Sequence, residues 1–562
     1  MAPNGKEGKH VEYPSRGDQL AQLLECVKEI ALPLVHDADD AMNTLVKAGK
    51  DGGSSTNLNA IGNFKSHEEL REGIPNLPAE GTGIRGFREA VSFLTQHSVN
   101  TCSPGFMDKL YSAPSPPGIA AELFLSILNN NSHVWHVSPA LSTVEKYVGA
   151  QLAQLFGLSG QDAGGITVPG GAAANMLAML VARNVVAPEI KKQGHTAKQR
   201  YAIFVSEAAH YSLANAAQIL GLGSEAVIRI PTRGDGTMDV DSLEISIETV
   251  LQNGTRPLLI AATAGTTVRG AFDPLVEIGR IARDANAWYH VDACWGGAVA
   301  FSDKLKHKLS GAELADSICF NPHKLLGVPL VCSFVLARDL RTFWLANKLE
   351  AGYLFHSPDT QMKPSGRVDP LANVMSDASL DVDGDERTQY CREWRKSAAL
   401  HNSPPASEIL DLASLTTQCG RKPDATKFYM HWIYYGTEGM ARDVEQAVDS
   451  AQYMARLVDS SPHLRLVGGM NVPFTQVCFY WTPRLTSKER SKEDCVITNS
   501  QNTQAICRTL VSRGWMIDYA PGSGTDGQYG NFIRVACNRL TSRNVVDALL
   551  NNLVEVGIDL DL

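Results

Sequence analysis

Reactive side chains follow several short apolar segments of this chain. Lys324 lies in "FNPHKLLGVPL", after the strand-like stretch 317–320. Asp292 lies near the end of "AWYHVDACW", and His210 comes directly after "RYAIFVSE". The segment "VPGGAAANMLAM" places Gly171 immediately before a helical run. Together these residues supply an amine, a carboxylate, an imidazole and a glycine-rich helix start. Such groups can hold an aldehyde that bears a phosphate and can draw electrons toward it.

These groups match the needs of pyridoxal phosphate. Its aldehyde requires an amine for a Schiff base, and a partly desolvated lysine such as Lys324 can lose its proton near neutral pH. Its ring nitrogen requires a carboxylate such as Asp292. Its phosphate suits the free N–H groups at the start of a helix after Gly170 and Gly171, and the imidazole of His210 can stack on the ring. Each residue alone is more often structural; their combination in this chain order favours the cofactor site.

The elements that must position these residues are predicted to alternate between strands and helices. Strand-like segments are "RYAIFVSE", "EAVIRIP", "RPLLIAATAG" and "AWYHVDACW", and the helical segments between them are "YSLANAAQILGL", "DSLEISIETVLQNG" and "PLVEIGRIARDAN". A further strand is expected over 328–337. This alternation predicts βαβ units and a mostly parallel sheet flanked by helices. Ligands collect at the carboxyl ends of such strands, which is where the reactive residues fall.

Three regions are predicted along the 562 residues. Residues 1–118 are expected to form a helical N-terminal segment, 119–424 a large cofactor-binding domain, and 425–562 a smaller C-terminal α+β domain. The polar segment 357–413 is predicted to be a long surface insertion of the kind that forms active-site lids.

Bulk composition narrows the classes of function. Hydrophobic residues make up 44% of the chain, and the net charge is −9 with no run of five like charges, which argues against a nucleic-acid partner. Neither a signal peptide nor an apolar stretch long enough for a bilayer is recognisable, so no membrane association is expected. The eleven cysteines are scattered without a C-x-x-C pair, which is typical of reduced thiols in the cytoplasm. No metal ion is predicted.

Six segments, in order, carry a resemblance to a known family: "PGGAAANM", "SEAAHYSLANAA", "ATAGTTVRGAFDP", "HVDACWGG", "FNPHKLLGVPLVCS" and "QCGRKPDATKF". With them the chain resembles the group II pyridoxal-phosphate amino-acid decarboxylases, most of all the animal-type glutamate, cysteine-sulfinate and aspartate decarboxylases. The resemblance runs from about residue 75 to the C-terminus, apart from the insertion. It implies the fold-type I architecture of pyridoxal-phosphate enzymes, with a large α/β domain and a smaller C-terminal domain.

The resemblance also implies roles for matching residues. Lys324 would bind the cofactor covalently, Asp292 would pair with its ring nitrogen, and His210 would stack on its ring. His323 would contact cofactor or substrate as a catalytic residue, and Asp273 would lie near the cofactor. The other cofactor contacts implied are Gly171, Ala172, Thr267, Asn321 and Gly420. Because Gly420 would reach the phosphate of the partner subunit, the resemblance implies a homodimer with shared active sites.

The reaction implied is loss of CO₂ from the α-carbon of a small acidic L-amino acid, which makes the protein a carboxy-lyase. Arg534, in "YGNFIRVACN", matches an arginine that contacts the substrate carboxylate, and a planar guanidinium suits that task. Phe106 matches a residue near the substrate. Asp108 stands where relatives carry Asn, and a carboxylate there would repel an acidic side chain unless it is paired or protonated.

The substrate and the outcome of the reaction stay open between several alternatives. Aspartate, which would give β-alanine, is slightly preferred to glutamate, which would give GABA, on the resemblance to insertion-bearing relatives; cysteine sulfinate is third. Relatives carry a proton-donating tyrosine where this chain has Ala406, although Tyr390 or His323 could substitute. An aromatic-amino-acid decarboxylase or an oxygen-consuming aldehyde synthase is therefore a second hypothesis. A catalytically inactive regulatory protein is a third, and retention of Lys324 argues against it.

Overall fold

The computed structural model describes residues 15–51, 58, 61–196, 199–348, 397–482, 491–522 and 529–562. Most of the predicted insertion at 357–413, including Tyr390, lies outside the described residues. None of the described helices combines the length and apolarity that a membrane span requires. The chain divides into two compact units. The first unit contains Met1–Phe106, Ile506–Met516 and Asp547–Leu562, and the second contains Met107–Ala505 and Ile517–Val546.

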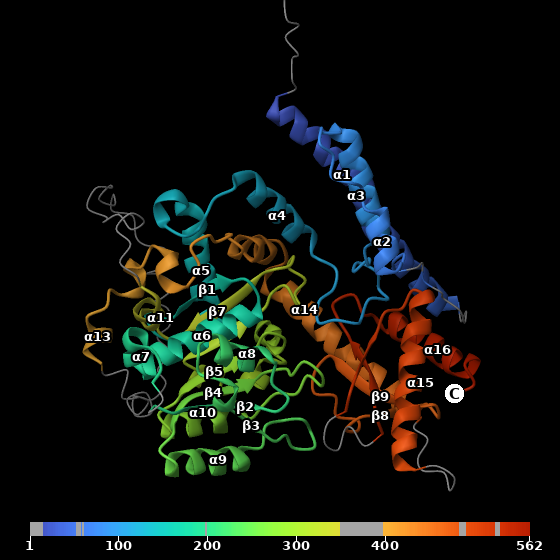
Figure 1. Ribbon diagram of the computed structural model, residues 1–562. Helices are drawn as coiled ribbons and strands as arrows, with labels where there is room; N and C mark the ends of the chain where they lie inside the picture. The colour runs from blue at the N-terminus through green and yellow to red at the C-terminus, as the bar shows by residue number, and fades with distance from the viewer. Residues whose placement is uncertain are drawn as a thin grey trace, which may run out of the picture. The chain divides into compact units, whose positions relative to one another are not determined.

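The first unit is built from helices. Its N-terminal part contains α1 (Arg16–Asp51), α2 (His67–Gly73) and α3 (Gly83–His97), which are labelled in Figure 1. A reciprocal pair of hydrogen bonds between Ser66 and Glu69 caps the start of α2. These helices confirm the predicted helical N-terminal segment.

A seven-stranded sheet forms the centre of the second unit, in the order β1-β7-β6-β5-β4-β2-β3. Its strands are β1 (Gly164–Val168), β2 (Tyr201–Ser206), β3 (Val227–Ile230), β4 (Arg256–Thr263), β5 (Trp288–Asp292), β6 (Ser317–Phe320) and β7 (Ser333–Ala337). The strands from β2 to β6 pair in parallel, whereas β7 is antiparallel to both of its neighbours. The predicted mostly parallel mixed sheet is confirmed.

Helices cover both faces of this sheet, because alternate residues of each buried strand point to opposite sides. The helices of this part of the chain are α4 (Pro116–Leu128), α5 (Pro139–Leu155), α6 (Gly171–Val186), α7 (Pro188–Gln193), α8 (Ser212–Ile219), α9 (Val240–Gln252), α10 (Leu275–Asp284), α11 (Leu340–Asn347), α13 (Ala398–His401) and α14 (Ala425–Ser460).

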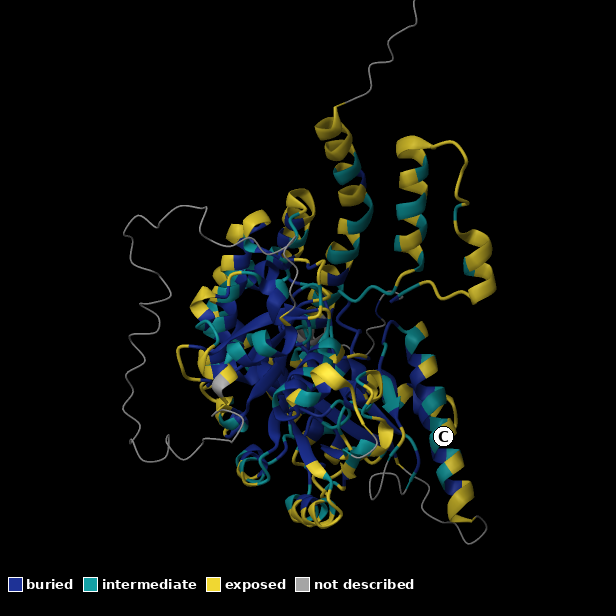
Figure 2. Cartoon of the chain, turned by 60° about the vertical axis from the view of Figure 1, so that its left-hand side comes forward, coloured by how far each residue is buried: buried dark blue, intermediate teal, exposed yellow. Residues whose placement is uncertain are grey.

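The two faces of the sheet belong to two apolar clusters. Phe204 joins one cluster with α5, α9, α10 and α14, and its neighbours Ile203 and Val205 join a second cluster with α6, α8 and α11. The strands are almost entirely dark blue in Figure 2.

The strand expected over 328–337 is shorter than predicted, because β7 begins only at Ser333. The preceding residues form a turn, in which the N–H of Gly327 donates to the carbonyl of Lys324 at 3.1 Å and that of Val328 donates to Pro322 at 3.2 Å. Pro329 has no N–H for a strand ladder, so pairing starts after it. Lys324 therefore lies in a turn between β6 and β7.

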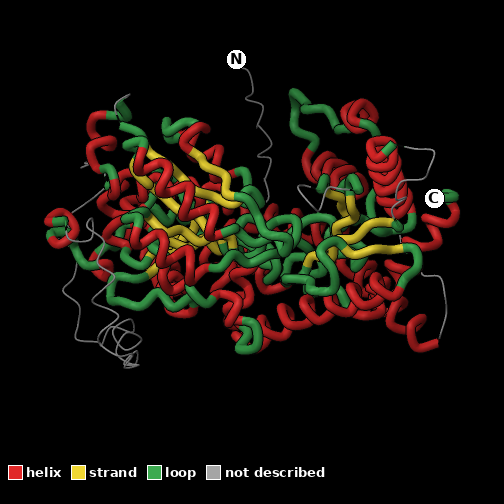
Figure 3. The backbone as a smooth tube through the Cα atoms, turned by 90° about the horizontal axis from the view of Figure 1, so that it is seen from below, coloured by secondary structure: helices red, strands yellow, loops and turns green. Residues whose placement is uncertain are grey.

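A second, four-stranded antiparallel sheet has the order β10-β11-β9-β8. Its strands are β8 (Leu464–Leu466), β9 (Gln476–Trp481), β10 (Asp518–Ala520) and β11 (Phe532–Ala536), shown in yellow with those of the large sheet in Figure 3. The last two helices are α15 (Lys492–Ser512) and α16 (Arg543–Asp559). The segments "TQVCFYWTP" and "NFIRVACN" predict β9 and β11. No strand is predicted from the sequence at β8 or β10, which are only three residues long.

Candidate active site

A cavity of about 160 Å³ in the second unit brings most of the predicted site residues together. Eight of them line it: Lys324, Asp292, His210, His323, Gly171, Ala172, Thr267 and Asn321. Five further residues complete the lining: Asn175, Thr263, Gly265, Cys294 and Trp295. Gly420, Arg534 and Phe106 are not among its lining residues. The sheet topology explains why these residues lie together. β4 ends at Thr263, β5 ends at Asp292 and β6 ends directly before Asn321, and the carboxyl ends of these parallel strands lie at one edge of the sheet.

Asp292 is the carboxylate of the cavity and is 4% exposed. Asn175 Nδ2 donates to its Oδ2 at 2.9 Å, and the N–H of Cys294 donates to its Oδ1 at 3.1 Å. Burial alone would raise the pKa of Asp292, but the hydrogen bond from Asn175 and the nearby Lys324 bring that pKa below its ordinary value. Asp292 is therefore ionised at neutral pH, as pairing with a protonated ring nitrogen requires.

Lys324 and His210 face the same cavity. Within the described part of the chain, the amine of Lys324 forms no hydrogen bond, so it is available to a ligand. His210 is partly buried, and its Nδ1 lies 2.8 Å from Ser212 Oγ. Burial lowers the pKa of His210, and Lys324 lowers it further against the opposing effect of Asp292. A neutral, flat imidazole beside the amine is suited to stacking on an aromatic ring.

Two main-chain groups of Cys332 contact Nδ1 of His323. The carbonyl oxygen lies 2.7 Å from Nδ1, and the N–H of the same residue points to it at 3.2 Å. Because the shorter contact is to an oxygen that can only accept, it favours hydrogen on Nδ1 over the weaker contact with the N–H. Burial lowers the pKa of His323 to about 4, so the ring is neutral at physiological pH. In this tautomer Nε2 is a bare acceptor and has no proton to donate in the cavity.

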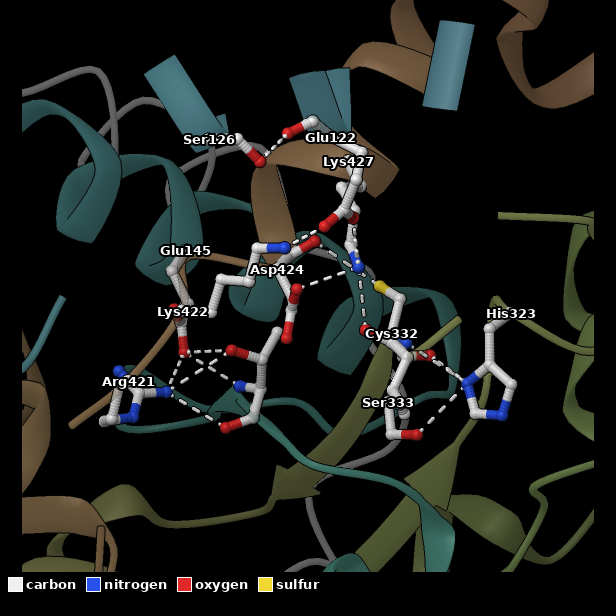
Figure 4. Close-up of polar contacts among 12 residues, drawn as sticks. Glu122, Ser126, Glu145, His323, Cys332, Ser333, Arg421, Lys422, Asp424 and Lys427 are labelled. Atoms are coloured by element: carbon white, nitrogen blue, oxygen red, sulfur yellow. Dashed lines mark hydrogen bonds and ion pairs between the residues drawn. The ribbon is translucent and has the colours of Figure 1, made fainter. Parts of the chain in front are cut away.

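Figure 4 shows two ion-pair groups of the second unit, of which the first lies beside the segment that contacts His323. Lys427, at the start of α14, donates to the carbonyl of Val331 at 2.9 Å, and its charge is balanced by Asp424 at 2.8 Å and Glu122 at 2.9 Å. This ties α14 to the segment that carries the His323 acceptor.

The second pair fixes the segment that follows Gly420. Arg421 lies 2.5 Å from Glu145, and both side chains are almost wholly buried. Arg421 also donates to the carbonyls of Ser132 and Thr167. Gly420 itself is exposed, with no atom within 4 Å of the position where a Cβ would lie.

Arg534 belongs to a compact cluster of four charges close to the cavity. Its Nη2 lies 2.6 Å from Asp518 Oδ2 and donates to the main-chain carbonyl of Asp108 at 2.8 Å. Lys109 bridges the two carboxylates, at 2.9 Å from each. Arg534 Nη1 donates at 3.1 Å to the carbonyl of Thr267, a residue that lines the cavity. The guanidinium is therefore next to the cavity but already has a carboxylate partner.

Asp108, at the position where the sequence resemblance predicts Asn, is paired with Lys109. Burial raises the pKa of Asp108 and repulsion from Asp518 adds to this, against the opposing effects of Lys109 and Arg534. The pairing with Lys109 offsets the repulsion that the Asp108 carboxylate would otherwise exert on an acidic substrate. Phe106 lies in the first unit, is 2% exposed and pairs with Met516.

The cavity fits pyridoxal phosphate on grounds independent of the sequence pattern. Gly171 permits a close approach, since a Cβ there would lie 2.6 Å from Cys294 Sγ and 2.9 Å from Asn321 Nδ2. Asn321 Oδ1 and Thr263 Oγ1 are buried and have no hydrogen-bond partner among the described residues. Such unsatisfied polar atoms beside a free amine and an ionised carboxylate are expected in a site that a polar ligand completes.

Ala406 is buried, with its N–H donating to Asp162 at 2.8 Å and its carbonyl accepting from Lys146 at 3.1 Å. It belongs to the apolar cluster that contains Ile203 and Val205, and it does not line the cavity. Residues 397–424 contain no tyrosine.

Sequence reasoning missed Asn175, which contacts Asp292. The available signal was "WYHVD", in which Trp288, His290 and Asp292 alternate and so share one face of β5. That face is covered by α6, which carries Asn175.

Comparison with known proteins identifies relatives over nearly the whole chain. Residues 84–366 match the family described as the pyridoxal-dependent decarboxylase conserved domain. A glutamate decarboxylase-like protein of Gibberella zeae is 53% identical, over 89% of this chain and 92% of the relative. An L-aspartate decarboxylase of Metarhizium robertsii is 38% identical, over 97% of this chain and 98% of the relative. The crystal structure of mouse CSAD is similar with a TM-score of 0.78 and 27% identity, covering 96% of this chain and 98% of that one.

Proposed function

This chain belongs to the pyridoxal-dependent decarboxylase family, and from that premise we propose that it removes the α-carboxylate of a small acidic L-amino acid. It is a pyridoxal-phosphate-dependent amino-acid decarboxylase, a carboxy-lyase. L-Aspartate, giving β-alanine, is the first candidate substrate and L-glutamate, giving GABA, is nearly level with it. The names of the two relatives cover both candidates.

The residues of the cavity are assigned to the cofactor as follows. When bound, pyridoxal phosphate withdraws electrons from the α-carbon of the substrate amine and so allows its carboxylate to leave. Lys324 would hold the aldehyde carbon covalently, Asp292 would keep the ring nitrogen protonated, and His210 would stack on the ring. The remaining parts of the cofactor would be held by Gly171, Ala172, Thr267 and Asn321. Its phosphate would lie at the start of α6.

The charge cluster beside Thr267 is the observation that carries the acidic-substrate proposal. Arg534 is 5% exposed, and its Nε is buried without a hydrogen-bond partner among the described residues. A substrate carboxylate that reached the guanidinium would satisfy this donor and compete with Asp518. Protonation of Asp108 would offset the added negative charge. Binding at this position would orient the substrate and so select which bond to the α-carbon is broken.

One assay tests the proposal. Purified protein with added pyridoxal phosphate would be offered aspartate, glutamate, cysteine sulfinate, DOPA and tryptophan separately, and CO₂, amine and aldehyde would be quantified. We expect amine equal to CO₂ from one of the acidic substrates. Activity on an aromatic amino acid alone would contradict the assignment of Arg534 to a substrate carboxylate.

A second candidate function is formation of an aldehyde with consumption of oxygen, from an acidic or an aromatic amino acid. The buried position of Ala406, where relatives carry the tyrosine that returns a proton to the α-carbon, supports it. So does the bare Nε2 of His323. In the same assay, aldehyde and oxygen uptake in place of amine would favour this candidate. If none of the substrates perturbs the visible spectrum of the cofactor, the remaining hypothesis is a catalytically inactive regulatory protein.

We also propose a cytoplasmic homodimer with shared active sites. The exposed Gly420, fixed by the buried Arg421 beside it, supports a contact with the partner subunit. Several described cysteines form no disulfide, which supports a reducing compartment; they are Cys26, Cys294, Cys319, Cys332, Cys419, Cys495 and Cys537. Sedimentation of the holoenzyme tests the dimer, and mixing a Gly420→Glu variant with a Lys324→Ala variant tests whether sites are shared.

A further inference from the structure

A line of hydrogen bonds is buried behind the cavity. Trp288 Nε1 donates to Ser317 Oγ at 2.8 Å, and the same hydroxyl lies 2.8 Å from His290 Nδ1. On the other side of the ring, His290 Nε2 lies 3.0 Å from Asn175 Oδ1. Ser317 and His290 are 0% exposed and Asn175 is 1% exposed. The line therefore runs from β5 and β6 to α6 without access to solvent.

Asn175 divides the line into two branches that end at the residues assigned to the cofactor. Its Nδ2 donates to Asp292 Oδ2 at 2.9 Å and to Ser212 Oγ, also at 2.9 Å. Ser212 Oγ in turn lies 2.8 Å from His210 Nδ1. The amide of Asn175 thus contacts Asp292 directly. It contacts His210 indirectly, through the hydroxyl of Ser212.

The ends of the line determine its direction. The indole of Trp288 can only donate, and the ionised carboxylate of Asp292 can only accept. The NH₂ group of Asn175 must therefore face Asp292, which leaves its oxygen toward His290. His290 Nε2 must then carry a hydrogen. Burial lowers the pKa of His290 to about 4, so the ring is neutral and its Nδ1 accepts from the hydroxyl of Ser317.

We propose that Asn175 is a positioning residue that orients Asp292 and His210 toward the cofactor, and that His290 holds the amide of Asn175 in the required orientation. If His290 could not donate, the amide could turn over and place its oxygen against Asp292, where two acceptors would repel. Cys319 Sγ, at 3.1 Å from Asn175 Oδ1, gives a weaker second donor to the same oxygen. The inference rests on the proposed cofactor site and is independent of the substrate side chain.

Two substitutions of His290 test this line of hydrogen bonds. His290→Leu removes the donor at similar volume, whereas His290→Gln can keep an N–H directed at Asn175. We expect His290→Leu to lower kcat about tenfold or more, the size expected when a buried hydrogen bond is lost, with little change in KM. Because Asp292 loses support for its ionised form, the pH dependence of the cofactor's visible absorption should move to higher pH. His290→Gln should recover part of both effects.

His431 provides a matched control. It is 1% exposed, its pKa is also lowered to about 4, and its Nδ1 also lies 2.8 Å from a serine hydroxyl, that of Ser115. His431→Leu should lower thermal stability but leave the absorption spectrum and its pH dependence unchanged. Equal spectra in wild type, His290→Leu and His290→Gln would overturn the proposal, since a purely structural histidine would change stability alone.

A measurement on the apoenzyme keeps the proposal testable if His290→Leu does not fold. NMR of ¹⁵N-histidine-labelled protein, with the His290 signals assigned by their loss in His290→Gln, should show a neutral ring with hydrogen on Nε2. Hydrogen on Nδ1 instead would contradict the proposal, because Nε2 could then not donate to Asn175. Failure of the proposed cofactor site would look different: wild-type protein would then show no visible absorption with pyridoxal phosphate, whatever tautomer His290 adopts.

Discussion

Arg534 and Asp518 form a partly buried ion pair across two neighbouring strands, with Nη2 of the arginine 2.6 Å from Oδ2 of the aspartate. The guanidinium assigned to the substrate carboxylate therefore has an internal competitor. Its affinity for a substrate is the difference between two carboxylate interactions, so changing either partner should change KM.

Substitution at this pair should move KM in opposite directions. Arg534→Met removes the cation, and loss of a hydrogen bond to a charged group should raise KM for the acidic substrate by roughly tenfold to a hundredfold. Asp518→Asn keeps the shape but removes the competing charge, so KM should fall. Steady-state kinetics measures both.

A control for this pair is Arg513→Met, because Arg513 is paired with Glu555 and Asp559 in the first unit. It should leave KM unchanged. If Arg534→Met also leaves KM unchanged, the guanidinium is structural and the substrate carboxylate binds elsewhere.

Lys324→Ala should abolish covalent attachment of the cofactor, because the amine that lines the cavity is removed. Treatment with borohydride followed by peptide mass mapping should find the cofactor on Lys324 in the wild type and on no peptide of the variant. Lys304→Ala, at an exposed lysine paired with Glu445, should label like the wild type. Labelling of Lys324→Ala at another lysine would refute the assignment.

Gly171→Ala should weaken cofactor binding without unfolding the protein. The added methyl group would meet Cys294 and Asn321 at the start of α6, closer than real Cβ atoms approach their neighbours. Titration of apoenzyme with pyridoxal phosphate should show a higher dissociation constant, with an unchanged far-UV spectrum. Gly234→Ala, where a Cβ would meet nothing within 4 Å, should bind like the wild type. Equal affinities would mean that the phosphate does not lie at this helix start.

Stability should fall on acidification, in part through His431. Burial lowers its pKa to about 4, below the ordinary 6.5. Between these values the unfolded chain binds a proton that the folded protein does not, so the free energy of unfolding decreases as pH falls from 6.5 toward 4. This contribution amounts to about 3 kcal/mol at most.

In His431→Gln the dependence of the unfolding free energy on pH should be less steep over that window. Denaturant titrations of both proteins at several pH values measure the difference. Asp273, whose pKa burial raises to about 6, contributes with the opposite sign, but it is present in both proteins and cancels. Parallel pH profiles for the two proteins would show that His431 does not titrate as described.

Six of the seven strands of the large sheet and most residues of the cavity at its edge could be predicted from the sequence, whereas β1 was not predicted. Lys324, Asp292, His210 and Gly171 each follow an apolar segment, and parallel strands bring their carboxyl ends to one edge whatever the details of packing. Local pattern is enough for this, because strand periodicity and glycine or proline positions are short-range properties of the chain.

The pairing and protonation of these groups depend on the tertiary structure. Arg534 meets Asp518 through the register of β10 and β11, and the tautomers of His323 and His290 follow from carbonyl and amide oxygens on other elements. Asn175 lies 117 positions from the carboxylate that it orients. Such contacts depend on packing between distant segments, and a hydrogen bond depends on tenths of an ångström that no local pattern specifies.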